Sequence, residues 1–241
     1  MGFERILAID TSGPAAGVAL FAGGGWWVQA WQGLGGRGEQ LTGVIDRALA
    51  EAGFRGQDLD GIAVAAGPGS YTGLRVGLAV AKTLAWAWQR PLAGVDTLAA
   101  MALGALWAAP VVVAAIDARH GEVFGGVYGR GQEAPVEAWW GPRAAPVEEL
   151  ARALGEVADR RGLERAAAAG DGCLAHRDAL VRLSPVEYVW VPEQESRIVQ
   201  VVSVGILGRL QLETGRHDDP AALDARYLKA TEAERRWLQK S

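Results

Sequence analysis

Residues Gly67–Ala85 read GPGSYTGLRVGLAVAKTLA, a glycine-rich turn followed by a long apolar stretch. A short apolar run, Ile62–Ala66, precedes the turn and predicts a strand. Three glycines within seven positions let the backbone adopt positive φ and approach another body closely. The spacing is neither that of a P-loop nor that of GxGxxG. A strand, a glycine turn and a helix in this order predict either an anion site at the helix N-terminus or tight packing of the helix on the strand.

The helix predicted over Thr72–Gln89 is apolar on almost every side, so it must be buried on more than one side. Small residues recur along it at every fourth position, where another helix could approach very closely: Gly73, Gly77, Ala81 and Ala85. A second helix, predicted over Glu39–Ala52, carries its apolar residues on one face. The side of the first helix that does not face the sheet therefore needs this second helix, another chain, or both.

The order of elements along the chain indicates a two-lobed α/β protein. The first lobe is predicted over residues 1–98, the second over 99–219, and residues 220–241 form a charged tail that could pack back on the first lobe. In each lobe a run of strands leads into alternating helices and strands, the order of an actin-like (ASKHA, ribonuclease H-like) fold. The stretch around Trp139-Trp140 is expected to be irregular. The other predicted elements are strands at Arg5–Asp10, Gly17–Phe21, Trp26–Trp31, Pro91–Val95, Val111–Ile116, Glu122–Tyr128, Arg165–Ala169 and Tyr188–Val191, and helices at Val147–Arg161, Ser196–Leu212 and from Asp96 or Thr97.

Polar side chains follow the first predicted strand. Asp10, Thr11 and Ser12 stand between that strand and the next, in IDTSGPAAGVAL. In nucleotide-binding proteins of the actin class, such a turn brings backbone N–H groups to phosphate and an acid near the metal. The same residues also suit an ordinary hydrogen-bonded turn, and both interpretations stay open. A nucleotide site here would combine these three residues with the glycine turn: Asp10, Thr11, Ser12, Gly67, Gly69 and Ser70.

The sequence offers little for independent catalysis, and we predict neither catalytic residues nor metal ligands. His120, His176 and His217 are too far apart in sequence to form a helical HxxxH pair. Cys173 is the only cysteine, and a lone thiol is more often buried structure than catalyst. Ser70 does not stand in a GxSxG motif. The segment Asp117–Phe124, DARHGEVF, could line a cleft or form a polar β-turn with Asp117 paired to Arg119.

Composition limits the partners and the location. The chain has 241 residues and a net charge of −4, whereas a protein that held nucleic acid alone would normally be basic. Any contact with RNA is therefore expected to be shared with a more basic partner. Residues Leu98–Ile116 carry no charge, but Pro110 interrupts them, so a buried helix followed by a strand is favoured over a membrane span. The N-terminus lacks a signal-peptide pattern, and we expect a cytoplasmic protein.

Four segments together resemble the TsaB (YeaZ) family, whose members are accessory subunits of bacterial tRNA threonylcarbamoyladenosine synthesis. ILAIDTS, GEQLTGVID, GPGSYTGLRVGLAVAKTLA and IDARHGEVF occur in the family's order. The resemblance covers the first 130 residues or so, is weak from Gly131 to Asp219, and returns at Ala225–Lys229. Two departures stand out. Arg37-Gly38-Glu39 replaces the family's His-Ser-Glu, and the terminal motif has alanine for proline and lysine for arginine.

The resemblance implies an actin-like scaffold subunit without catalytic activity of its own. Family members pair with the catalytic paralogue TsaD, and an ATPase, TsaE, joins the assembly. ATP or ADP and a metal ion are then expected in the partner or at the junction, and tRNA is reached only through the complex. The free chain could also form a homodimer. The partner contacts implied for this chain lie on its first two helices: Leu41, Val44, Ile45, Ala48, Gly73, Arg75, Gly77, Val80, Ala81, Leu84, Ala85 and Trp88.

Two other functions remain as alternatives. In one, the chain is an independent actin-like ATPase or small-molecule kinase, which requires Mg²⁺-dependent turnover that is sensitive to Asp10→Ala. In the other, it is a protease, since distant relatives have been called glycoproteases. The missing metal ligands argue against proteolysis, which would have to be insensitive to chelators and lost on a single-residue change.

The small-residue stripe leads to a first prediction. If a partner helix packs on Gly77 and Ala81, Ala81→Glu should leave a folded chain that no longer binds its partner. Gel filtration of the mixed proteins tests this, and unchanged co-elution would contradict it.

Overall fold

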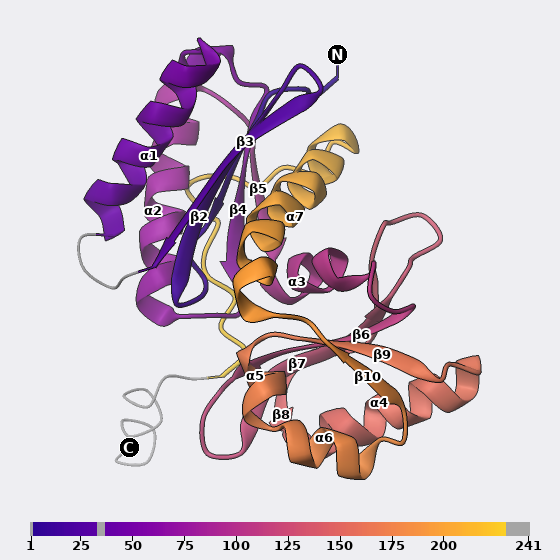
Figure 1. Cartoon of the computed structure of the whole chain (residues 1–241). Coiled ribbons are helices and arrows are strands. Elements are labelled where there is room, and N and C mark those ends of the chain that lie inside the picture. Colours follow the sequence, from indigo (N-terminus) through magenta and orange to yellow (C-terminus); the bar gives the residue numbers. More distant parts are fainter. Residues whose placement is uncertain (1, 33–36, 230–241) are drawn as a thin grey trace.

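The computed structural model describes residues 2–32 and 37–229, which form two lobes, each built on a five-stranded sheet (Figure 1). The first sheet has the order β3-β2-β1-β4-β5 and the second has the order β10-β9-β6-β7-β8. The elements of the first sheet and its connections are β1 (Ile6–Asp10), β2 (Ala15–Ala22), β3 (Gly25–Gln32), α1 (Arg37–Ala52), the short 3-10 turn Gly56–Asp58, β4 (Gly61–Gly67), α2 (Tyr71–Trp88) and β5 (Leu92–Asp96). Those that follow are α3 (Thr97–Ala105), β6 (Val111–Asp117), β7 (Glu122–Gly129), β8 (Glu137–Pro146), α4 (Val147–Arg161), β9 (Arg165–Ala169), α5 (Asp171–Ala175), α6 (Arg177–Leu183), β10 (Glu187–Trp190) and α7 (Glu193–Glu213).

The two sheets repeat one plan. Strands β1, β2 and β3 form an antiparallel meander, and β4 and β5 add to it in parallel. In the second sheet β6, β7 and β8 form the meander, and β9 and β10 are the parallel strands. This repetition confirms the actin-like α/β fold predicted from the order of elements.

Helices cover both faces of the first sheet (Figure 1). Helices α1 and α2 lie on one face, and α7 packs on the other against β1, β2, β4 and β5. Helix α3 lies between α7 and the second sheet, so it joins the lobes. Its N-cap is Asp96, whose carboxylate accepts a hydrogen bond from the Ala99 amide at 2.9 Å. Burial of apolar side chains between these layers provides the main stabilisation of the first lobe.

Helix α7 corrects the predicted domain division. The sequence interpretation assigned Ser196–Leu212 to the second lobe, but the structure packs α7 on the first sheet. The close approach depends on Gly205 and Gly208, which face Phe21 and Ala63 without an intervening side chain. The local pattern correctly predicted a helix but did not indicate which sheet it covers.

The second sheet also differs in detail from the prediction. Residues 137–146 were expected to be irregular, yet they form the edge strand β8. Register shifts opposite Val127 and a positive φ at Gly141 interrupt the pairing, which is why the alternating pattern of a strand is not visible in the sequence. The short helices α5 and α6 were not predicted.

Ten residues of the predicted tail are described; they run along the first lobe and end at the second. The Leu223 side chain is buried in its core, and its carbonyl accepts a hydrogen bond from Lys82 Nζ at 2.8 Å. The Arg226 amide donates to the Ala66 carbonyl at 2.7 Å. Residues 230–241 of the predicted tail lie outside the described residues.

Most of the predicted partner contacts are buried inside this chain, which corrects the expected interface. The small residues of α2 pack on the chain's own first lobe, and the apolar face of α1 packs on the first sheet, because both helices use these faces to close the core. The buried members are Leu41, Val44, Ile45, Ala48, Gly73, Gly77, Ala81 and Ala85. Arg75, Val80, Leu84 and Trp88 remain at least partly exposed, so only these four stay predictions as contacts.

Residues Leu98–Ile116 form α3 and β6, as expected for a helix followed by a strand. Among the described residues, no helix is both long and apolar enough to cross a membrane.

The burial of Ala81 reverses the first prediction. Ala81 is fully buried, so Ala81→Glu places an unpaired charge in the core and should destabilise the fold by about 3 kcal/mol or more. Ala79 lies on the exposed side of the same helix, and Ala79→Glu should change stability by less than about 0.5 kcal/mol. Urea unfolding of the two variants measures this difference. Equal stability of the two would contradict the assignment of the buried face.

Candidate functional site

A cavity of about 330 Å³ lies between the lobes. The turn after β1, the glycine turn before α2 and Gln200 of α7 line it from the first lobe. The turn after β6 and the start of α5 line it from the second. Its volume lies at the lower end of the range found for small-molecule pockets. The cavity therefore brings together residues that are far apart in the sequence.

Asp10 is the buried carboxylate of this cavity. Its Oδ1 accepts hydrogen bonds from the Ser12 amide at 2.9 Å and from Ser12 Oγ at 2.6 Å. Its Oδ2 accepts from Gln200 Nε2 at 2.6 Å. Burial raises the pKa of Asp10 above its ordinary value, while these hydrogen bonds act in the opposite direction. Both oxygens are thus committed to hydrogen bonds within the chain. Gln200 was missed because nothing in its local sequence sets it apart.

The glycine turn packs directly on the turn after β1. The Ser70 amide donates to the Ser12 carbonyl at 2.6 Å, and a Cβ at Gly69 would lie only 2.5 Å from that carbonyl oxygen. Ser70 Oγ caps α2 by accepting from the Gly73 amide at 3.3 Å. Tight packing, one of the two interpretations of this turn, is therefore observed. The Ser70 amide is already bonded and is not available to an anion.

The six predicted nucleotide-binding residues separate into two groups. Asp10, Ser12, Gly69 and Ser70 line the cavity. Thr11 is fully buried, and its Oγ1 donates to the Gly73 carbonyl at 2.7 Å. Gly67 has a φ of 114°, and a Cβ there would lie 2.7 Å from the Arg226 carbonyl oxygen. Thr11 and Gly67 hold the turn in place and do not line the cavity.

The second-lobe wall carries the predicted DARHGEVF cluster. Asp117 Oδ1 accepts from the Arg119 amide at 2.9 Å, and the two side chains form an ion pair with an N–O distance of 3.4 Å. Asp171 Oδ1 accepts from the Asp117 amide at 3.1 Å. Asp117, Arg119 and Asp171 line the cavity, so the segment is both a polar turn and a cavity wall. Neither His120 nor His176 is among the lining residues. His176 Nε2 lies 3.7 Å from Asp117 Oδ1.

The charges of the cavity are predominantly negative. Three carboxylates, Asp10, Asp117 and Asp171, face it with the single guanidinium of Arg119. A polyphosphate would be repelled here unless a cation accompanied it. In the described ranges 2–32 and 37–229, no three His, Cys, Asp or Glu side chains gather as they would around a metal ion.

The lone thiol is not a reactive group in this structure. Cys173 is fully buried, and its Sγ lies 3.4 Å from the Val113 carbonyl oxygen. Burial raises the pKa of Cys173 to about 12, so the thiolate is not formed near neutral pH.

A second candidate site is the outer face of helix α2. Five residues at spacings of three or four positions share this face and are all exposed: Tyr71, Arg75, Ala79, Thr83 and Trp86. We call them the α2 stripe. Tyr71 is 42% exposed and Trp86 is 79% exposed, whereas large apolar side chains are usually buried. The Arg75 guanidinium lies 4.1 Å from the centre of the Tyr71 ring. The sequence did not set this stripe apart, because apolar residues occur on almost every side of the helix.

A family model described as "TsaD: tRNA N6-adenosine threonylcarbamoyltransferase" matches residues 38–158, which is half of the chain. The chain belongs to this family. It is 41% identical over 131 residues to the tRNA threonylcarbamoyladenosine biosynthesis protein TsaB of Escherichia coli, which covers 52% of this chain and 55% of that protein. It is 36% identical over 124 residues to the protein of the same name from Bacillus subtilis, which covers 51% and 54%. The chain thus spans about half the length of the curated relatives it matches.

The structural comparison extends the similarity beyond the aligned half. The solved structure of YeaZ from Pseudomonas aeruginosa matches with a TM-score of 0.75 at 27% identity. The match covers 95% of this chain and all of that one. Together with the curated relatives, this confirms the predicted membership in the TsaB (YeaZ) group.

The environment of Asp10 predicts a dependence of stability on pH. Since its folded pKa is raised, the folded chain binds more protons than the unfolded chain at pH values above about 4. This contribution to stability is present at low pH and is lost as the pH rises through the folded pKa. Asp10→Asn removes the titration, so the stability of the wild type relative to this variant should fall as the pH rises. Urea unfolding at several pH values measures the difference, with Asp159→Asn at an exposed position as the control for net charge. If the free energy of unfolding of the wild type rose with pH relative to that of Asp10→Asn, the raised pKa would be contradicted.

Proposed function

We propose that this chain is a non-catalytic accessory subunit of the complex that installs threonylcarbamoyl on adenosine next to the anticodon of tRNA. In this proposal it acts by forming a heterodimer with the catalytic paralogue TsaD. The names of its curated relatives support a role in this modification. The observation that carries the partner role is the α2 stripe, whose five residues are all exposed. Within the described residues, Tyr227 contacts Tyr71 and Arg75 at one end of it and leaves the rest of the stripe open.

The α2 stripe has the form of a helix-packing surface. Its large side chains, Tyr71 and Trp86, stand at the two ends, and aromatic residues often dominate the energy of an interface. Its centre is formed by Ala79 and Thr83, which are small enough for another helix to lie close. Because TsaD is homologous to this chain, its equivalent helix is the natural occupant. The interface therefore lies on the opposite side of α2 from the small-residue stripe predicted first.

The state of the polar groups supports a role without catalysis. Asp10 is saturated by hydrogen bonds from Ser12 and Gln200, and Ser70 Oγ caps a helix. The thiol of Cys173 is buried. The same facts argue against a protease that would use Ser70 or Cys173 as its nucleophile, since Ser70 Oγ accepts a helix-capping hydrogen bond and Cys173 is buried. We propose that ATP or ADP and the metal ion belong to the partner or to the junction, with TsaE as the ATPase and a cytoplasmic location.

RNA contact is proposed to occur through the complex. The chain carries a net charge of −4, and the affinity of a lone protein for tRNA would depend mainly on positive charge. A more basic partner would supply the phosphate contacts.

A second candidate function is an independent actin-like ATPase or small-molecule kinase. The observation that favours it is the interlobe cavity, which Asp10, Ser12 and Ser70 line. Mg²⁺-dependent ATP turnover by the purified chain that is lost in Asp10→Ala would establish this function. If the rate of ATP turnover were the same in the wild type and in Asp10→Ala, this function would be excluded.

The partner interface is tested by Ala79→Glu. A carboxylate at the centre of a close helix contact would be desolvated without a partner, so the TsaD dissociation constant should rise at least about 30-fold. Isothermal titration calorimetry with purified TsaD measures this constant. Ala175→Glu makes the same change at an exposed position of α5 in the second lobe and should bind like the wild type. Wild-type affinity of the Ala79→Glu variant would exclude the α2 stripe as the interface.

A further inference from the structure

Residues 218–229 run along the first lobe and end at the second, and we call them the C-terminal strap (yellow in Figure 1). At its start the Asp218 amide donates to the Leu92 carbonyl at 2.8 Å, and Asp218 Oδ2 accepts from the Gly94 amide at 2.7 Å. Farther on, Leu223 fills the core of the first lobe. These contacts fix the first half of the strap on β5 and α2.

The middle of the strap lies directly on the glycine turn. The Arg226 amide donates to the Ala66 carbonyl at the end of β4. The Arg226 carbonyl is so close to Gly67 that any side chain at Gly67 would displace the strap. One function of this glycine is therefore to admit the strap, and the glycine turn is enclosed between the strap and the turn after β1.

The next residue reaches the α2 stripe. The Tyr227 ring packs on the Tyr71 ring with 5.3 Å between their centres, and the Tyr227 hydroxyl accepts a hydrogen bond from Arg75 Nε at 3.2 Å. Tyr227 is 39% exposed, so part of its ring stands beside the exposed stripe. The strap thus adds a third aromatic ring to the outer face of α2.

The last described residue of the strap bonds to the other lobe. Lys229 forms an ion pair with Glu122 at the start of β7, and the Lys229 side chain is only 17% exposed. Glu122 also closes the turn that lines the cavity, since its carbonyl accepts from the Ala118 amide at 3.0 Å and its amide donates to the Arg119 carbonyl at 3.1 Å. The cavity wall and the outer face of α2 are therefore linked through only a few residues of the strap.

We propose that the C-terminal strap couples the interlobe cavity to the partner surface. While Lys229 is paired with Glu122, Tyr227 stays on Tyr71 and Arg75 and completes the α2 stripe. A movement of the cavity wall that separates Glu122 from Lys229 frees the end of the strap and removes Tyr227 from this surface. The effect on partner affinity rests on the proposed function, whereas the coupling within the chain does not.

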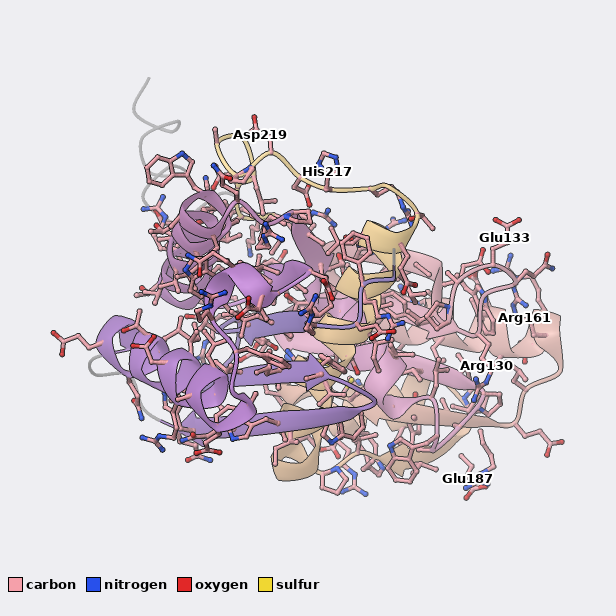
Figure 2. The ribbon with its side chains drawn as sticks, turned by 90° about the horizontal axis from the view of Figure 1, so that it is seen from above. Arg130, Glu133, Arg161, Glu187, His217 and Asp219 are labelled. Carbon is pink, nitrogen blue, oxygen red and sulfur yellow. The ribbon has the colours of Figure 1, made fainter. Side chains whose placement is uncertain are left out.

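Charge reversal tests the coupling in the isolated chain by hydrogen exchange. Glu122→Lys and Lys229→Glu each replace an attraction by a repulsion, and each should speed exchange of amides 224–228 at least about threefold. Amides 71–75 at the start of α2 should also exchange faster. The double variant, with the charges swapped, should return both segments to the wild-type rates. Glu133→Lys makes the same charge change in the second lobe and should have no effect. Figure 2 shows Glu133 far from Asp219 of the strap.

Binding to TsaD provides the second measurement. Each single reversal should weaken binding several-fold, although Glu122 is not on α2, and the double variant should restore it. The coupling is overturned if the single reversals leave exchange at residues 224–228 unchanged, or if the double variant exchanges as fast as the single ones. It is also overturned if only residues 224–228 respond, while residues 71–75 and TsaD binding do not. If the wild type fails to bind TsaD, the proposed function fails, and the exchange rates alone decide the coupling.

Discussion

The close contact between helix α2 and the turn that follows β1 is the constraint on which the rest of the structure depends. Thr11 bonds to the Gly73 carbonyl, and a Cβ at Gly77 would collide with Thr11 Oγ1. This contact requires the small-residue face of α2 to point inward. It also fixes the direction of the opposite face, so the orientation of the α2 stripe follows from the same packing that closes the core.

The same contact positions the candidate cavity. The glycine turn reaches the Ser12 carbonyl because Gly69 has no side chain, and the adjacent Asp10 accepts hydrogen bonds from Ser12 and from Gln200 of α7. A carboxylate that is satisfied from three directions is better suited to holding α7 against the turn than to activating a substrate. The cavity, the glycine turn and the strap are thus parts of one packed unit.

The sequence predicted local structure well and long-range packing poorly. Helix Val147–Arg161 and strand Arg165–Ala169 have the predicted bounds. A helical periodicity of apolar residues defines the helix, and the strand is a short apolar run that ends at Gly170. The small-residue stripe was also recognised, but spacing along one helix cannot tell whether a sheet of the same chain or another protein lies against it. The bond from Gln200 to Asp10 joins residues 190 positions apart, and the local sequence of neither residue encodes it. The placement of α7 and the strap was unpredictable for the same reason.

Photo-cross-linking to TsaD tests the central claim most directly, because it identifies which face of α2 contacts the partner. A photoreactive amino acid at Thr83, on the exposed stripe, should form a covalent product with TsaD, and mass spectrometry should locate that product on a helix of TsaD. The same amino acid at the exposed position Ala175 should form none. Cross-linking from Ala175 but not from Thr83 would contradict the account and would place the partner on the second lobe.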